Sequence, residues 1–475
     1  MYKLFYIFPV LFCCLPARAQ NEQKMFWALN GSASAFTWDN TTGNNRIDNG
    51  SGTWNTTNKT WTFNKGITDL VWRPGATAIF GGNPGTGAAG TVTVTGTQTV
   101  QSLAFNLAAS GNFILTGGTI TNTSGMITVN DTATINSTLA GTSGLTLAGT
   151  KTLTIGGTTT YTGTTTVNSG ILVLSNGTAG STTPTLTTPI VILPGGTLAA
   201  DIFVGNINLS GTISGSGTLA LANTTPQAQS MRLYGNNSGF TGNFSEPSTS
   251  RGMMWSDNVG AGNAAITGSA AASWDCSGSF GFIETAGAAT PTVQLGSLSG
   301  STSTTTLGGF GGSGTKTFQI GALNTSTTFA GAIQDNPQAT GTPVIALIKV
   351  GTGTLTLSGT NTYSGITTVD AGTLAFTTAV PSSATWNIAV NATSTPTSAA
   401  SGLITLPASP GMTGKTVNIV LTGTSTGFIW QAVSWTGLVL FAPTLKINGT
   451  TVTSGVPSAG TTVTFTATSG IKVTR

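Results

Sequence analysis

The chain has no histidine, the side chain that most often acts as a general base or a zinc ligand near neutral pH. A Ser-His-Asp triad and a histidine-based metal site are therefore excluded. Charge is also scarce, because 475 residues include only 16 basic and 12 acidic side chains. The few cations form no cluster, which argues against nucleic acid as a partner, since phosphate recognition needs grouped Lys and Arg.

Cysteine and long apolar runs are equally rare. Cys13 and Cys14 lie in the amino-terminal segment, so the rest of the chain has Cys276 alone and no internal disulfide. For that thiol an inert, buried state is the simplest interpretation. The later apolar run at 344–350 is short and contains Lys349, so we expect no transmembrane segment after the amino-terminal region.

Residues 1–19 have the pattern of a secretory signal peptide. Lys3 precedes an apolar stretch from Leu4 to Leu15, and Ala17-Arg18-Ala19 then forms an A-x-A cleavage site. We expect cleavage after Ala19. A lipoprotein signal fits less well, because the residues before Cys13 are not small. The prediction is a secreted or cell-surface protein.

One block of sequence occurs twice, 202 residues apart and without insertion. The copies read KTLTIGGTTTYTGTTTVNSGILVL (Lys151–Leu174) and GTLTLSGTNTYSGITTVDAGTLAF (Gly353–Phe376). The positions that agree include Leu, Gly, Tyr and Val. A self-similar unit of this size indicates a solenoid rather than a globular enzyme.

Apolar residues alternate with Thr or Ser along most of the chain, as in TVTVTGTQTV at 91–100. This period of two is typical of half-buried strands, with Leu and Val inside and Thr outside. In the second block it predicts short strands at 354–357, 366–369 and 373–376. We interpret one block of 22 residues, 353–374, as about one coil of a three-sided parallel β-helix.

The composition shifts along the chain and predicts four segments. These are the signal peptide (1–19), a Trp-rich amino-terminal cap with the first coils (20–90), the β-helix with repeats at 151–174 and 349–376 (91–378), and carboxy-terminal β-rich coils with a cap (379–475).

Five of the ten Trp residues precede residue 73. An open solenoid end exposes strand edges and a cross-section of the core, and bulky aromatics suit the task of covering it. Alternatively, Trp54 and Trp61, which flank Asn55 and Asn58, could stack on sugar rings and contact a glycan. The sequence leaves both roles open.

The second block meets the pattern G-x-G-x-L-x-L-x-G-x-N-x-Y-x-G-x-T-x-V-x-x-G-x-L in full, from Gly351 to Leu374. It resembles the autotransporter-associated β-strand repeat of bacterial surface passengers. The first block departs from the pattern with Lys151 at a glycine position and Thr159 for Asn. The resemblance implies an all-β, right-handed parallel β-helix whose motif residues are structural.

The glycines of the motif can be assigned a structural role from their lack of a side chain. Gly359, Gly365 and Gly372 are expected at corners that need either a positive φ or close stacking of backbones. A β-branched residue at Gly359 should therefore cost stability.

Polysaccharide-cleaving β-helices need clustered carboxylates for acid-base work or calcium binding. The nearest acidic pairs here are Asp39 with Asp48 and Asp275 with Glu284, each nine residues apart. The glycine run at 308–312 contains no Asp, so it does not match a calcium-binding glycine repeat. We therefore predict no catalytic residue, no cofactor and no metal site.

The resulting prediction is a non-catalytic, adhesive surface passenger of a bacterium with an outer membrane. The alternatives are a polysaccharide-binding module and a β-helical polysaccharide-degrading enzyme. Extracellular polysaccharide or components of the cell envelope or matrix are the expected partners, and outward Thr ladders could also meet ice or a crystalline polymer. The tail after Phe376 shows neither the strands of a membrane barrel nor a sorting tail, so the mode of anchoring stays open.

Overall fold

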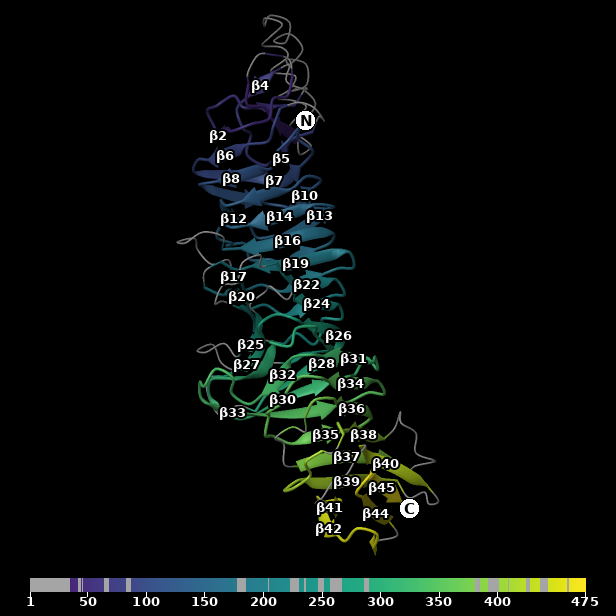
Figure 1. Cartoon of the computed structure of the whole chain (residues 1–475). Helices are drawn as coiled ribbons and strands as arrows, with labels where there is room; N and C mark the ends of the chain where they lie inside the picture. Colours follow the sequence, from purple (N-terminus) through teal and green to yellow (C-terminus); the bar gives the residue numbers. More distant parts are fainter. Residues whose placement is uncertain are drawn as a thin grey trace, which may run out of the picture. The chain divides into compact units, whose positions relative to one another are not determined.

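The computed structural model describes residues 35–475 with gaps, and the predicted signal peptide lies outside the described residues. Every regular element in the described part is a β-strand. The chain forms two compact units, Met1–Ser143 and Gly144–Arg475 (Figure 1). The gaps are 42–43, 45, 64–67, 83–86, 177–184, 204, 223–229, 235, 247–251, 257–266, 286–289, 380, 382–384, 392–400, 409, 424–427, 436–442 and 459–460.

In the amino-terminal unit, two stacks of parallel strands form successive coils. The first stack is β1 (Ala35–Trp38), β5 (Ala76–Phe80), β7 (Thr97–Phe105) and β10 (Met126–Val129), and from β7 it also continues to β9 (Thr119–Asn122) and β12 (Thr138–Ala140). The second is β2 (Gly52–Trp54), β6 (Thr91–Val94), β8 (Phe113–Thr116) and β11 (Ala133–Ile135). At β1 the direction reverses, because β3 (Trp61–Thr62) and β4 (Asp69–Leu70) add antiparallel.

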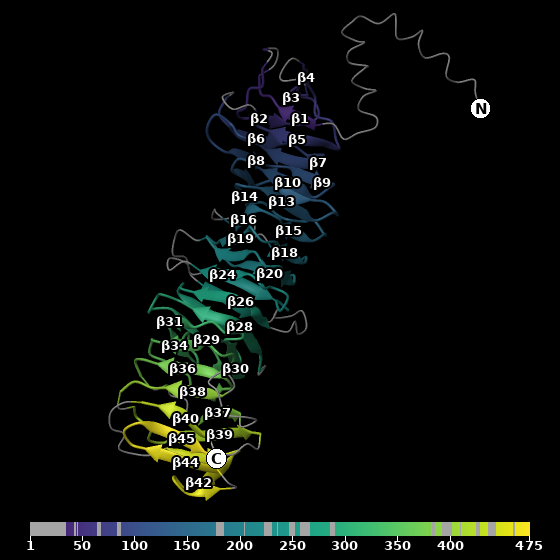
Figure 2. The same cartoon turned by 90° about the vertical axis from the view of Figure 1, so that its right-hand side faces the viewer.

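The second unit has three faces of parallel strands. Its first face joins strands from successive coils, several of which Figure 2 shows one below another. It runs through β14 (Thr152–Ile155), β16 (Gly170–Ser175), β19 (Gly196–Asp201), β22 (Thr218–Leu221), β24 (Asn243–Glu246), the second halves of β26 (Gly268–Cys276) and β28 (Thr292–Ser299), then β31 (Thr327–Phe329), β34 (Thr354–Leu357), β36 (Gly372–Phe376), β38 (Gly402–Thr405) and β40 (Ile429–Ser434).

The other two faces are built in the same way. The second face contains β13 (Leu145–Gly149), β15 (Thr165–Val167), β18 (Ile190–Ile192), β21 (Ile213–Ser214), the first halves of β26 and β28, β30 (Ser313–Ile320), β33 (Thr342–Lys349), β35 (Thr367–Val369), β37 (Thr385–Asn391), β39 (Thr416–Thr422) and β41 (Thr444–Ile447). The third face contains β17 (Thr185–Leu186), β20 (Ile207–Leu209), β23 (Met231–Tyr234), β25 (Gly252–Ser256), β27 (Phe280–Glu284), β29 (Thr306–Phe310) and β32 (Ala332–Gln334).

These stacks confirm the predicted fold class, an all-β parallel β-helix. The carboxy-terminal end is closed by strands that run the other way. On the first face β40 pairs antiparallel with β45 (Gly470–Thr474), and β45 pairs antiparallel with β44 (Thr461–Thr466). A reversed strand cannot continue the coil, so this hairpin covers an edge that would otherwise offer unpaired backbone groups.

The repeat block occupies the coil differently from our prediction. The three short strands exist, as β34, β35 and β36, but the first and third lie on the same face, where Leu355 pairs with Leu374. One coil therefore takes 19 residues here, and the first block shows the same step from Leu153 to Leu172. The third side of the coil is an irregular corner rather than a strand, because the backbone N–H groups of Thr362 and Tyr363 both donate to the carbonyl of Ile333.

Both corners contain the same buried hydrogen bond. The Tyr363 and Thr367 hydroxyls lie 2.8 Å apart, and Tyr161 and Thr165 repeat this distance. Burial raises the pKa of Tyr161 to about 12, so its hydroxyl stays neutral and pairs inside the coil. Asn361 completes its own corner, since its Oδ1 accepts from the backbone N–H of Ile333 at 3.0 Å. The agreement between the copies thus reflects packing and satisfied polar groups.

Glycine is required at the three motif positions for two different reasons. Gly372 has φ 64°, which only glycine adopts without strain. Gly359 and Gly365 do not have a positive φ, but the neighbouring coil passes so close that an added Cβ would overlap a backbone carbonyl, that of Gly331 or Ile345. Close stacking, and not the sign of φ, therefore requires glycine at these two positions.

We predict that Gly359→Ala lowers the free energy of unfolding by about 1–3 kcal/mol, because the methyl group overpacks the contact with the Gly331 backbone. Gly411→Ala is the matched control, since a Cβ there meets nothing within 4 Å, and it should leave stability within about 0.5 kcal/mol. Chemical denaturation measures both. Equal stability of the two variants would contradict the stacked corner.

Candidate functional site

Four Trp rings pack together at the amino-terminal end of the first unit. Trp61 lies 5.0 Å from Trp54, 4.6 Å from Trp72 and 5.3 Å from Trp38, measured between ring centroids. Phe80 extends the cluster toward the next coil. Most of these contacts are edge-to-face or tilted, the arrangements that aromatic quadrupoles favour. The cluster covers the first coil where β3 and β4 reverse direction.

The two candidate glycan contacts, Trp54 and Trp61, lie inside this cluster. Both side chains are 0% exposed. Stacking on a sugar ring requires a ring face open to solvent, and neither indole has one in this arrangement. The packing supports the capping role. Glycan contact by these residues stays a prediction, and it would require the cluster to open.

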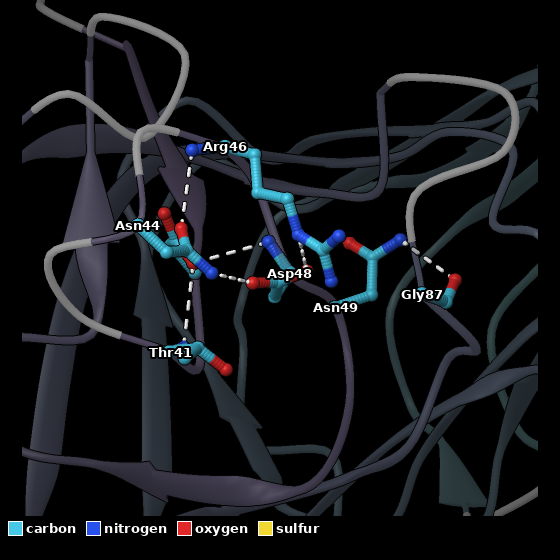
Figure 3. Close-up of polar contacts among 7 residues, drawn as sticks. Thr41, Asn44, Arg46, Asp48, Asn49 and Gly87 are labelled. Atoms are coloured by element: carbon cyan, nitrogen blue, oxygen red, sulfur yellow. Dashed lines mark hydrogen bonds and ion pairs between the residues drawn. The ribbon is translucent and has the colours of Figure 1, made fainter.

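A polar loop follows β1, and Figure 3 shows its residues Thr41, Asn44, Arg46 and Asp48. Trp38 Nε1 donates to the carbonyl of Gly50 at 3.1 Å, which joins the loop to the aromatic cluster. Oδ1 of Asp39 accepts hydrogen bonds from the backbone N–H of Thr41 at 3.4 Å and of Asp48 at 3.1 Å. Asp48 in turn accepts from Arg46 Nε at 2.6 Å and from the Asn44 amide. Each carboxylate therefore holds a turn of its own loop.

The two carboxyl groups differ in their electrostatics. Burial, together with the nearby charges of Asp69 and Asp48, raises the pKa of Asp39 to about 6. The Arg46 guanidinium instead holds the pKa of Asp48 below its usual value. Divergent pKa values are typical of acid-base pairs. Here, however, Asp39 is 0% exposed, so no substrate could reach it, and the pair is structural.

The second predicted acidic pair, Asp275 with Glu284, is divided between two faces. Glu284 ends β27 on the third face, where it accepts from Ser256 Oγ at 2.6 Å and lies 3.3 Å from Arg232. Asp275 lies on the first face and accepts from Ser277 Oγ at 2.6 Å. A spacing of nine residues turns a corner of the coil, so these two carboxylates serve different networks.

The sequence analysis missed three buried ionisable groups in the second unit. Glu246 faces the interior in register with Cys276, and burial raises the pKa of its carboxyl well above the usual value. Lys316 and Lys349 are also buried, and each amino group donates to three backbone carbonyls. The strict alternation in Asn243–Glu246 was the available signal, because it places Glu246 on the same side as Phe244.

The described residues contain no group of three His, Cys, Asp or Glu side chains that could hold a metal ion. In the same part of the chain, no helix is long and apolar enough to cross a membrane. The ionisable groups set out above are either buried or committed to loop and corner hydrogen bonds.

Comparison with known proteins identifies the repeat. Residues 145–174 and 347–376 match the passenger-associated-transport-repeat, and these are the two blocks whose corners are described above. The chain carries autotransporter passenger repeats. Both passenger repeats lie in the second unit, and the resemblance inferred from their sequence pattern is confirmed.

A curated relative matches part of this chain. The Adhesin BmaC autotransporter of Brucella suis biovar 1 (strain 1330) is 37% identical over 135 residues, which make up 27% of this chain and 4% of that protein. The match thus spans a small part of the adhesin's length. No solved structure matches the chain.

We predict that Asp39→Asn stabilises the protein at pH 7.5. The folded-state pKa of about 6 lies above the ordinary 3.8, so folding favours the protonated acid. The stability from this group is complete below pH 3.8 and is lost as the pH rises through about 6. Thermal unfolding from pH 4 to 8 should show a weaker loss in the variant than in the wild type.

Asp48→Asn is the control for this prediction, since its pKa is shifted downward and its stabilisation should disappear at low pH instead. The variant should therefore be less stable than the wild type at pH 7.5. A wild-type pH profile in Asp39→Asn would contradict the assigned role of Asp39.

Proposed function

We propose that the protein is a non-catalytic, adhesive β-helical passenger displayed at, or released from, a bacterial cell surface. The passenger repeats and the partial match to an autotransporter adhesin support the surface placement. The predicted signal peptide at residues 1–19 and an outer-membrane location are part of this proposal, as is adhesion by this chain itself.

The filled interior of the coils is the observation that carries the proposal. In the repeat, Leu355 and Leu374 are stacked inside and at most 1% exposed, while Thr356, the residue after Leu355, points outward. Tyr363 fills the corner completely. Because apolar and aromatic side chains fill the inside of the repeat, we assign contact with a partner to its outer surface.

We propose a non-catalytic role because of the surroundings of the acidic residues. Asp39 and Glu246 are buried, and Asp48, Asp275 and Glu284 are held by neighbours in the same loop or on adjacent coils. Glycoside hydrolysis needs two carboxyl groups that face each other across a substrate. No observation on the described residues favours such a pair.

Beads coated with residues 20–475 test this function. They should adhere to surfaces coated with cell-envelope or extracellular-matrix material several-fold more than albumin-coated beads do. In the same preparation, neutral and acidic polysaccharides should release no reducing ends. Retention at the albumin level would refute adhesion, and steady release of reducing sugar would refute the non-catalytic assignment.

A further inference from the structure

The first face of the second unit carries a continuous outward surface, which we call the outer strip. It comprises the outward-facing residues of β14, β16, β19, β22, β24, β26 and β28. Each strand pairs in register with the next, so equivalent side chains form columns across seven coils. One column contains Thr152, Thr197, Thr218, Asn243 and Ser273, with Ile171 after the first; Ser297 continues the register but is only 6% exposed.

The side chains of the outer strip are short, and almost all of them are uncharged. Its second column contains small residues such as Val173, Ala220 and Ser245 beside the polar column. Asp201 and Asp275 are the charged side chains among the strip residues; Ser175 donates to Asp201 at 3.3 Å, and Ser277 donates to Asp275 at 2.6 Å. The strip therefore offers hydroxyl and amide groups, interrupted by methyl groups and, at Ala199, by a position that is only 4% exposed.

The spacing of these groups is regular. Neighbouring strands lie ~4.8 Å apart, so the seven coils extend over roughly 29 Å, and side chains on one strand repeat every ~6.7 Å. A polymer lying across the strands meets a polar group at nearly every step. Each hydrogen bond contributes only about 0.5–1.5 kcal/mol, so useful affinity requires many equivalent contacts with an equally repetitive partner.

The chemistry of the strip selects the class of partner. Polyanions need grouped cations, and the strip contains no Lys or Arg. Protein partners are usually anchored by Trp, Tyr or Arg in pockets, and the strip has none of these. Strand addition needs a free edge, whereas the inner strands of this face are paired on both sides.

The other faces do not offer an equal surface. On the second face β21 has two residues and continues through a single bridge between Gly215 and Phe240. On the third face the outward positions include Arg232 and Glu284 as an ion pair, with Phe282 beside them. Only the first face keeps two columns of mostly small residues, with Asp275 as their one charged member, in register across these seven coils of the described chain.

We propose that the outer strip binds a neutral linear polysaccharide that lies along the stack of coils. This rests on the proposed adhesive function and names its contact surface and partner class. Hydroxyl and amide side chains exchange hydrogen bonds with the sugar hydroxyls, and Ile171, Val173 and Ala220 contact the apolar edges of the rings.

Affinity electrophoresis of residues 20–475 tests the strip, with gels containing xyloglucan or dextran as neutral polymers and polygalacturonate as the acidic one. A neutral polymer should retard the wild type, and polygalacturonate should not. Thr218→Arg places a long charged side chain in the polar column and should weaken binding about tenfold, the effect of about 1.4 kcal/mol. Thr368→Arg, an outward substitution on the second face, should bind like the wild type.

Ser245→Lys, in the other column, is the second strip variant, and melting curves show which variants keep the fold. Absence of retardation by both neutral polymers would overturn the proposal, as would stronger retardation by polygalacturonate. Equal binding by folded strip variants and Thr368→Arg would also overturn it. If beads carrying Thr218→Arg still adhere like the wild type, adhesion stands without the strip. If wild-type beads do not adhere, the adhesive function fails, and the gels alone decide the strip.

Discussion

The backbone ladder between successive coils is the constraint on which the structure depends. Leu153 lies beside Leu172, and Leu172 beside Leu198, because each strand bonds to the strands of the coils before and after it. With a side-chain period of two, a slip of one residue would turn the apolar column outward. The same closeness forbids a side chain at Gly359, where the next backbone occupies the space. Because of this alternation and this close stacking, the chain is rich in Thr, Gly and Leu.

Because of this constraint, the interior residues of the coil serve packing, and the proposed function is left to the outward residues. Some interior polar groups are paired, as Tyr363 is with Thr367 and Lys349 is with three carbonyls, whereas the carboxyl oxygens of the buried Glu246 have no hydrogen-bond partner among the described residues. Burial lowers the pKa of Lys349 to about 8 and raises that of Glu246, which shows how expensive interior charge is in this fold. Recognition is left to the outward residues, which are short, neutral and repeated along the stack.

Much of the fold could be predicted from the sequence, because alternation and repetition are local patterns. The strands β34, β35 and β36 follow from Leu, Val and Phe at every second position. The face on which each strand lies could not be predicted, since the corner around Asn361 turns without forming a strand. The surroundings of Trp54 were equally hidden, because its burial depends on rings that approach from β3 and β5. Glu246 was missed because one acidic residue at an inward position contradicts the rule that identified the strands.

The central claim is that the first and third strands of a repeat are neighbours on one face. Thr356→Cys with Ala375→Cys tests it most directly, because these outward residues pair in register and parallel neighbours lie within the Cα separation of about 4.4–6.8 Å that a disulfide needs. Mild oxidation should cross-link this pair, and the buried Cys276 thiol should not interfere. Failure of this pair to cross-link, together with cross-linking of Thr356→Cys to Thr368→Cys on the second face, would contradict the account.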